Sequence, residues 1–332
     1  MFSIYSIHDG KSEMLPNLTQ QQMKEVSEVW VDLVSPTEDD IIALAPLIKI
    51  PEEVITDVRD VNEVPKLDKL DGMFYLLAQT PLFTPPKDTE QLDIKYSVNP
   101  LAILLTPQCI VTISARKNDV ISYLETKIKN TSHNHIVDTQ HQPQFVTKIL
   151  LLTAKMYLRY LRDLYNRLQI PLAERRLTEL DKEIIDLLSI ERSLVYFNAA
   201  LSSNYIVLEK LARRRGFMET EDDRELLDDT IDEMRQALEM VKVYGHIAED
   251  TRNALSSLIS NNLTRTVNWL TKLTLILMLP TLVGTFYGMN VPLPFTNSLH
   301  AFSIVVGISL LISVVGALWI RSRETGHYEM KK

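Results

Sequence analysis

The sequence has little cysteine, no recognisable catalytic motif and no signal-peptide pattern among its first residues. Its single cysteine, Cys109, excludes an intrachain disulfide, and its setting in QCIVTIS predicts a buried thiol in a strand. The amino terminus has no basic segment followed by an apolar core, so we expect no cleaved signal peptide. The sequence contains no P-loop, HExxH, CxxC or nucleophile elbow, and we therefore expect no enzyme.

The sequence also has fewer basic residues than acidic ones. The 332 residues include 35 Lys and Arg against 43 Asp and Glu, for a net charge of −8. Nucleic-acid-binding proteins usually present a basic surface, and the short run Arg213–Arg215 does not supply one. We therefore expect no nucleic-acid partner.

Two apolar runs near the C-terminus are the most distinctive feature that is present. Leu273–Met289 and Ala301–Ile320 each approach the ~20 residues that cross a hydrocarbon core. They predict a two-helix transmembrane domain over residues 269–320 in a lipid bilayer, with an external loop at 290–300 and a basic tail at 321–332. Two helices buried in a soluble core are the alternative interpretation.

Basic residues around these runs predict the orientation. They precede the first run and follow the second, and none lies in the loop between them: Arg265, Lys272, Arg321, Arg323, Lys331 and Lys332. Because Lys and Arg near a span stay on the cytoplasmic side, both termini are expected in the cytoplasm. The protein is then a multi-pass protein of the plasma membrane.

Residues 1–142 predict a cytoplasmic α/β domain. Short β-prone runs are expected as strands at Val29–Leu33, Met73–Phe83, Leu92–Val98, Leu101–Thr106 and Cys109–Ser114, with a break at Asn99-Pro100. A helix is expected after Ser35, with Ser35 as its N-cap and Glu38 three residues later. The whole chain is thus predicted to be an α+β membrane protein.

Residues 143–268 predict a helical stalk. Three helices are expected: Phe145–Gln169, one from Pro171 to near Gly216, and one from about Glu221 with no proline before Pro280. The third carries an apolar stripe at 4-3-4-3 spacing, made of Leu227, Ile231, Met234, Leu238 and Val241. This spacing is typical of packing against other helices, and so long a helix predicts an oligomer.

A polar line runs through the first apolar segment at helical spacing. Its members recur every three or four residues and share one side of a helix: Thr264, Asn268, Thr271, Thr274, Met278, Thr281 and Thr285. Hydroxyls in a membrane helix can face water or bond to their own backbone, and the spacing alone leaves both open. The apolar stripe upstream runs in phase with the line, which favours a shared pore axis. Val267, Leu270 and Met278 predict an apolar constriction.

The residues that end this segment carry a family resemblance. Tyr287-Gly288-Met289-Asn290 resembles the Y-G-M-N signature of CorA-type magnesium transport proteins, and the segment Leu279–Val291 resembles that family throughout. Upstream blocks such as WVDLVSPTEDDI and VNPLAILLTPQCIVTIS resemble the family's cytoplasmic blocks. The resemblance covers nearly the whole chain.

The resemblance implies a homopentameric funnel whose pore is lined by the long helix, with the second span outside it. Tyr287, Gly288, Met289 and Asn290 would form a selectivity filter, in which amide oxygens accept hydrogen bonds from hydrated Mg²⁺. Gly288 is expected to let the backbone turn tightly at the helix end. Mg²⁺ is the implied transported ion, and Co²⁺ is a second candidate.

The resemblance also implies a regulatory Mg²⁺ site between adjacent subunits. Asp57 falls at the matching position, and its partner is Asp229, with Asp228 as the alternative. Carboxylates repel one another until a cation bridges them, which provides a physical switch. The sequence departs from the family where Thr264 and Val267 replace a usual Asn and Met, and where Asn253 replaces an acidic residue, so these positions leave the ion preference open.

We therefore expect a passive Mg²⁺ uptake channel that cytoplasmic Mg²⁺ closes. Two alternatives stay open: a Zn²⁺, Co²⁺ or Ni²⁺ transporter of the same fold, and a membrane-tethered cation sensor that moves no ion. The polar line has neither His nor Cys, the ligands that softer metals prefer, which favours Mg²⁺.

Overall fold

The structure is a computed structural model that describes residues 2–8, 11–15, 27–84, 95–130, 138–169, 180–214, 216–218, 220–289, 294 and 300–329. The chain divides into two compact units, Met1–Arg252 and Asn253–Lys332. Asn290, most of the expected loop at 290–300 and residues 330–332 lie outside the described residues. Each unit is considered by itself.

The first unit contains a seven-stranded sheet in the order β2-β1-β3-β7-β6-β5-β4. Its strands are β1 Phe2–His8, β2 Lys11–Met14, β3 Val29–Val34, β4 Lys66–Leu70, β5 Met73–Phe83, β6 Tyr96–Leu105 and β7 Cys109–Ser114. The pair β3–β7 is parallel and the other neighbours are antiparallel. The helices are α2 Glu38–Leu44, α3 Glu52–Arg59, α4 Asp119–Asn130, α5 Gln142–Leu168, α6 Leu180–Ala212 and α7 Glu221–Tyr287.

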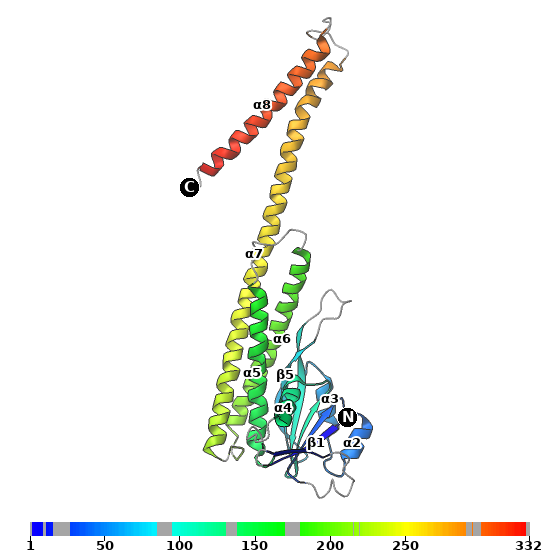
Figure 1. Ribbon diagram of the computed structural model, residues 1–332, viewed down its shortest axis with the longest axis vertical. Helices are drawn as coiled ribbons and strands as arrows, with labels where there is room; N and C mark the ends of the chain where they lie inside the picture. The colour runs from blue at the N-terminus through cyan, green and yellow to red at the C-terminus, as the bar shows by residue number, and fades with distance from the viewer. Residues whose placement is uncertain are drawn as a thin grey trace. The chain divides into compact units, whose positions relative to one another are not determined.

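Helices cover both faces of this sheet because its central strands are apolar on both sides. In β3, Trp30 belongs to one core cluster, whereas Val29 and Val31 belong to the other. The Trp30 side packs against α4, α5, α6 and the first part of α7, and the opposite side packs against α2 and α3. Figure 1 shows these two helical layers on either side of the strands. The predicted α/β domain is therefore present.

The predicted break at Asn99-Pro100 is wrong, because β6 runs through it without interruption. Pro100 pairs with Gln79 of β5, where a proline has no N–H to offer. The Gln79 N–H instead donates to Asn204 Oδ1 at 2.9 Å, and its C=O accepts from Asn204 Nδ2 at 2.6 Å. Because an α6 side chain satisfies both groups of Gln79, the proline leaves neither of them unpaired.

The N-cap of α2 is Thr37, two residues later than the expected Ser35. Thr37 Oγ1 accepts from the Asp40 N–H at 3.2 Å, and Asp40 Oδ2 accepts from the Thr37 N–H at 3.0 Å. This reciprocal capping box uses an aspartate at the third position in place of the expected glutamate. Ser35 instead donates to the Ala115 carbonyl at 2.6 Å and ties the loop to the end of β7.

The long helix α7 begins at the predicted residue, Glu221, and comprises 67 residues. Its apolar stripe packs against other helices as expected, but these helices belong to the same chain. Leu227, Met234 and Val241 are buried in one core with α5 and α6. Tyr244 stacks on Tyr165 of α5 with ring centroids 4.6 Å apart. The stripe is thus covered within the chain and lends no support to a shared axis between chains.

The second unit is a pair of helices, formed by the last part of α7 and by α8, Ala301–Glu329. The two helices touch closely at Gly316, where an added Cβ would lie 2.8 Å from Leu279 Cδ1. Small residues allow such approach in membrane helix pairs. Both helices are long and apolar enough to cross a membrane.

Candidate functional site

The threonine hydroxyls on the polar line bond back to the backbone of α7. Thr264, Thr271 and Thr274 each donate to the carbonyl four residues earlier, at 2.9, 2.8 and 2.8 Å. Thr281 and Thr285 do the same at 2.9 and 2.7 Å. The proton of each hydroxyl is therefore used inside the helix, and the oxygen retains lone pairs that can accept from outside.

This line is fully exposed in the chain. Its members and the two added apolar positions all rank as exposed: Thr264, Val267, Asn268, Leu270, Thr271, Thr274, Met278, Thr281 and Thr285. Within the second unit, α8 covers a different side of α7. The partly buried positions there are Ile276, Leu279, Pro280, Val283 and Tyr287. Most of these positions come two residues after a member of the polar line, which places them roughly 200° away from it around the helix.

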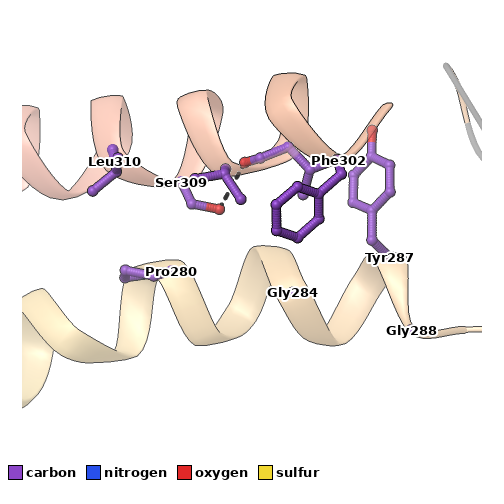
Figure 2. A pocket seen from close by; sticks show the side chains of 9 residues that line it. Pro280, Gly284, Tyr287, Gly288, Phe302, Ser309 and Leu310 are labelled. Carbon is purple, nitrogen blue, oxygen red and sulfur yellow. Dashed lines mark hydrogen bonds between the residues drawn. The ribbon is translucent and has the colours of Figure 1, made fainter. Parts of the chain in front are cut away.

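Figure 2 shows the side of α7 that α8 occupies. Pro280 and Tyr287 of α7 and Phe302 of α8 point into the gap between the helices, which forms a hollow of about 530 Å³. Ser309 donates to the Val305 carbonyl of its own helix at 2.9 Å, so it bonds along α8 rather than across the gap. Because α8 packs on this side, the threonine line stays available for another partner.

The signature at the end of α7 is described through Met289. Tyr287 donates its hydroxyl to the Pro294 carbonyl at 3.3 Å and so joins the helix end to the following segment. Gly288 lies at the turn that ends the helix. Its backbone does not adopt a left-handed conformation, and an added Cβ would meet only two carbonyl oxygens, both at 3.5 Å. The helix end as far as Met289 therefore shows no need for glycine; the turn into Asn290 lies outside the described residues, and the expected role of Gly288 stays a prediction.

Asp57 lies in α3 and is 7% exposed. Its Oδ2 accepts from the Lys66 ammonium at 2.8 Å and from the Tyr75 hydroxyl at 2.7 Å. Lys66 also lies 3.3 Å from Glu63 and 3.6 Å from Glu53. The carboxylate proposed as a regulatory ligand thus already has a cation of its own chain beside it.

The pKa values of Lys66 and Tyr75, the two residues that bond to Asp57, reflect this cluster of charges. Burial disfavours the charged form of Lys66, but the hydrogen bonds that the ammonium donates to Asp57 and Glu63 outweigh it and raise the pKa of that ammonium. Burial, together with the nearby Asp57 carboxylate, raises the pKa of the Tyr75 hydroxyl well above its usual range. Lys66 therefore stays charged and Tyr75 stays neutral at physiological pH.

Asp228 and Asp229 are both exposed on the first part of α7, but their surroundings differ. Asp228 lines a hollow of about 390 Å³ together with Arg213 and Arg224. Asp229 does not line that hollow. Within the described residues neither carboxylate forms an ion pair, since Arg213 pairs with Glu209 and Arg224 with Glu221, so both stay open to a cation from outside.

Sequence reasoning missed Lys66 and Tyr75. Both lie in strands, on β4 and β5, while Asp57 lies in a helix, so no helical or strand spacing connects them. The only signal was a lysine in EVPKLDKL, a segment that also holds two acidic residues and a second lysine. In the part of the chain that the structure describes, no group of three His, Cys, Asp or Glu side chains is placed to hold a metal ion.

The apolar windows of the two spans are exposed. None of the residues in the window of α7 is buried, and only 6% of those in the window of α8 are. Helices of a soluble core would be mostly buried, so the alternative of two core helices does not fit. A folded α/β unit followed by an exposed apolar helix pair defines a membrane protein with two C-terminal spans.

Comparison with known proteins gives the family. A family model described as CorA-like Mg²⁺ transporter protein matches residues 27–322. The cobalt/magnesium transport protein CorA of Methanocaldococcus jannaschii is 25% identical over 317 residues, which cover 95% of this chain and 96% of the relative. The chain belongs to the CorA-like Mg²⁺ transporter family, and the resemblance seen in the sequence is confirmed.

Solved structures confirm the fold. The complete CorA magnesium transporter from Methanocaldococcus jannaschii matches with a TM-score of 0.72 at 20% identity, over 97% of both chains. The full-length CmaX protein matches with a TM-score of 0.64 at 13% identity, over 95% of this chain and 97% of that chain. The predicted order of soluble α/β domain, long helix and two apolar C-terminal helices is therefore confirmed.

Proposed function

We propose that several copies of this chain form a channel that lets Mg²⁺ enter the cell passively. The observation that carries the proposal is the exposed threonine line on α7, on the side of the helix away from α8. Mg²⁺ gives up its water reluctantly, and the bound water molecules point their hydrogens outward. Hydroxyl oxygens whose own protons are already bonded are suited to accept those hydrogens.

A single helix pair encloses no lumen, so the proposal requires an oligomer. The family resemblance implies a homopentamer in which five α7 helices face one axis, and the exposure of the line supports such a contact. Five Asn290 side chains, next to Tyr287, Gly288 and Met289, would then form the filter at the outer mouth. Native mass spectrometry in a mild detergent should give five copies of the chain, and a monomer under all conditions would contradict this.

The driving force is the membrane potential. With both termini in the cytoplasm of a cell whose plasma membrane is negative inside, a divalent ion gains roughly 4.6 kcal/mol at 100 mV. No coupled ion is then needed for uptake. Co²⁺ is the second candidate ion, because the Methanocaldococcus relative is described as a cobalt/magnesium transport protein. The threonine line offers neither His nor Cys to Zn²⁺ or Ni²⁺.

The proposed gate is cytoplasmic Mg²⁺ held between Asp57 of one copy and Asp229 of the next. The buried position of Asp57 and its bond to Lys66 mean that Mg²⁺ has to compete with, or stand beside, that ammonium. Asp57→Asn should weaken closure by internal Mg²⁺ while leaving flux at low Mg²⁺ intact. Unchanged closure in both Asp57→Asn and Asp229→Asn would refute this gate.

The channel proposal is tested by Mg²⁺ flux into proteoliposomes that contain a Mg²⁺-sensitive dye. Thr274→Val removes the hydroxyl and keeps the shape, and we expect flux to fall by about tenfold. Thr266→Val is the matched control, because Thr266 makes the same backbone bond, to the Asn262 carbonyl at 3.0 Å, but lies off the line. Asn290→Ala should also reduce flux.

The outcomes separate the alternatives. Equal flux in Thr274→Val and Thr266→Val would refute the assignment of the pore face. If wild-type protein moves Zn²⁺ or Co²⁺ but not Mg²⁺, the ion assignment is wrong. If it moves none of these ions, the membrane-tethered sensor replaces the channel.

A further inference from the structure

A hollow of about 570 Å³ lies in the first unit, away from every residue discussed so far. It is bounded by the ends of β5 and β6 that carry Phe83 and Tyr96, by the start of α4 and by the middle of α5. No part of the proposed transport function uses it. Its walls combine aromatic rings with charged side chains of both signs.

Two exposed aromatic rings lie at the rim of the hollow, and neighbouring rings hold one of them, Phe83, in place. Phe83 and Tyr123 are 39% and 38% exposed at the rim. The ring of Phe83 packs on Tyr96 with centroids 5.3 Å apart, and Tyr96 packs on Tyr160 at 4.8 Å. Since Tyr96 is buried, the exposed Phe83 ring rests on a fixed neighbour and presents a ready surface for another planar ring.

The acidic side chains of the hollow are occupied by donors of the chain. Asp119 Oδ2 accepts from the Phe83 N–H at 2.9 Å and from the Tyr160 hydroxyl at 2.7 Å. Asp163 Oδ2 accepts from the Tyr96 hydroxyl at 2.5 Å and from Arg167 Nε at 2.9 Å. Burial opposes ionisation of Asp163, but these two bonds outweigh it and lower its pKa. These carboxylates are thus structural and hold the aromatic walls in position.

The basic side chains that line the hollow have no polar partner within the described residues. Lys117 and Arg159 both line it and are exposed, and neither makes a hydrogen bond or an ion pair within the part of the chain that the structure describes. The charge available to a ligand here is therefore positive.

We propose that this hollow binds a nucleotide. A planar base would stack on the exposed rings of Phe83 and Tyr123, and the phosphates would pair with Lys117 and Arg159. Bases of any kind stack on aromatic side chains, and the planar guanidinium of arginine matches the geometry of phosphate oxygens. Inorganic phosphate would use only the cations, and a nucleoside would use only the rings, so both should bind more weakly than the nucleotide.

The test is isothermal titration calorimetry of full-length protein in detergent with ADP, in magnesium-free buffer so that chelation adds no heat. We expect saturable binding of one ADP per chain. Lys117→Gln and Arg159→Gln should each weaken it by about tenfold. Arg162→Gln is the matched control, since Arg162 lies three residues further along α5 and does not line the hollow. Tyr123→Phe should keep the affinity and Tyr123→Ala should lower it.

Three results would overturn the inference. The first is no binding of ADP by the intact protein. The second is unchanged binding in the Lys117→Gln/Arg159→Gln variant, once its thermal unfolding shows that it is folded. The third is inorganic phosphate binding as tightly as ADP, which would leave a general anion site without a role for the rings. None of these results depends on whether the protein transports Mg²⁺.

Discussion

The ion pair between Lys66 and Asp57 gives the sharpest test of the regulatory site. In Lys66→Met the Asp57 carboxylate, whose side chain is 9% exposed, loses its cation while Glu53 and Glu63 remain nearby. A hydrogen bond to a charged group contributes roughly 1.5–3 kcal/mol, and breaking a buried pair costs about 3–5 kcal/mol. The Lys66 side chain is 30% exposed, so the loss should lie at the low end, near ~2 kcal/mol.

This loss in the free energy of unfolding corresponds to a measurable shift in the midpoint of thermal unfolding. For a domain of this size, 1 kcal/mol shifts the midpoint of thermal unfolding by about 2–4 °C, so Lys66→Met should lower the midpoint by roughly 4–8 °C in magnesium-free buffer. Mg²⁺ should restore part of it, because the loss of Lys66 leaves three carboxylates that can turn toward a shared cation, although they are not placed around one while the lysine is present. The measurement is circular dichroism of the full-length protein in detergent, with and without millimolar Mg²⁺.

The control is Lys69→Met on the same strand. Lys69 is exposed and has no ion pair within the described residues, so its loss should change the midpoint little. An unchanged midpoint for Lys66→Met would show that the pair does not stabilise the domain. A lowered midpoint that Mg²⁺ fails to raise would show that the cluster around Asp57 does not bind this cation, even without its lysine.

Three further predictions follow from contacts described here. Asn204→Ala should lower the stability by about 1–3 kcal/mol, measured by chemical unfolding, because it leaves the backbone groups of Gln79 without their α6 partner. Burial raises the pKa of Asp32 to about 7, so the folded protein keeps a proton that the unfolded chain loses above about pH 4, and stability falls as pH rises from about 4 to about 7. Asp32→Asn should therefore raise the unfolding midpoint more at pH 8 than at pH 5, and an equal effect at both values would contradict this. Gly316→Ala should be tolerated because Leu279 can move its Cδ1, whereas Gly316→Ile should lower thermal stability in detergent, and Leu279→Ala should partly restore it.

The sequence predicted the elements that local physics determines. The start of α7 at Glu221 and its length followed from the apolar spacing and from the absence of proline, and the two spans followed from length and hydropathy. Local rules were less reliable where a distant side chain intervenes. Pro100 predicted a break in the strand. The strand continues because Asn204, more than a hundred residues later, bonds to the backbone groups of Gln79, which faces Pro100 on the neighbouring strand.

The candidate sites also combine features that the local sequence predicts with features that only the fold reveals. The threonine line was visible from spacing alone, but the choice between water and backbone as the partner of its hydroxyls was not, and the structure shows that the protons go to the backbone. Asp57 could be aligned from the sequence, whereas Lys66 could not be connected to it without the fold. The apolar stripe on α7 had the spacing of an intermolecular seam, and only the packing of α5 and α6 showed that it is internal.

The bonding of the threonines has a consequence for anions. On the exposed line from Thr264 to Thr285 every hydroxyl donates inward to a carbonyl, so the outer side offers lone pairs and no polarised hydrogen from these groups. Chloride requires hydrogen-bond donors to replace its water, and along these threonines it finds none. If this side of α7 faces the proposed pore, the hydroxyl dipoles from Thr271 to Thr285 favour cations over anions, in a stretch of chain that has no acidic side chain to repel them.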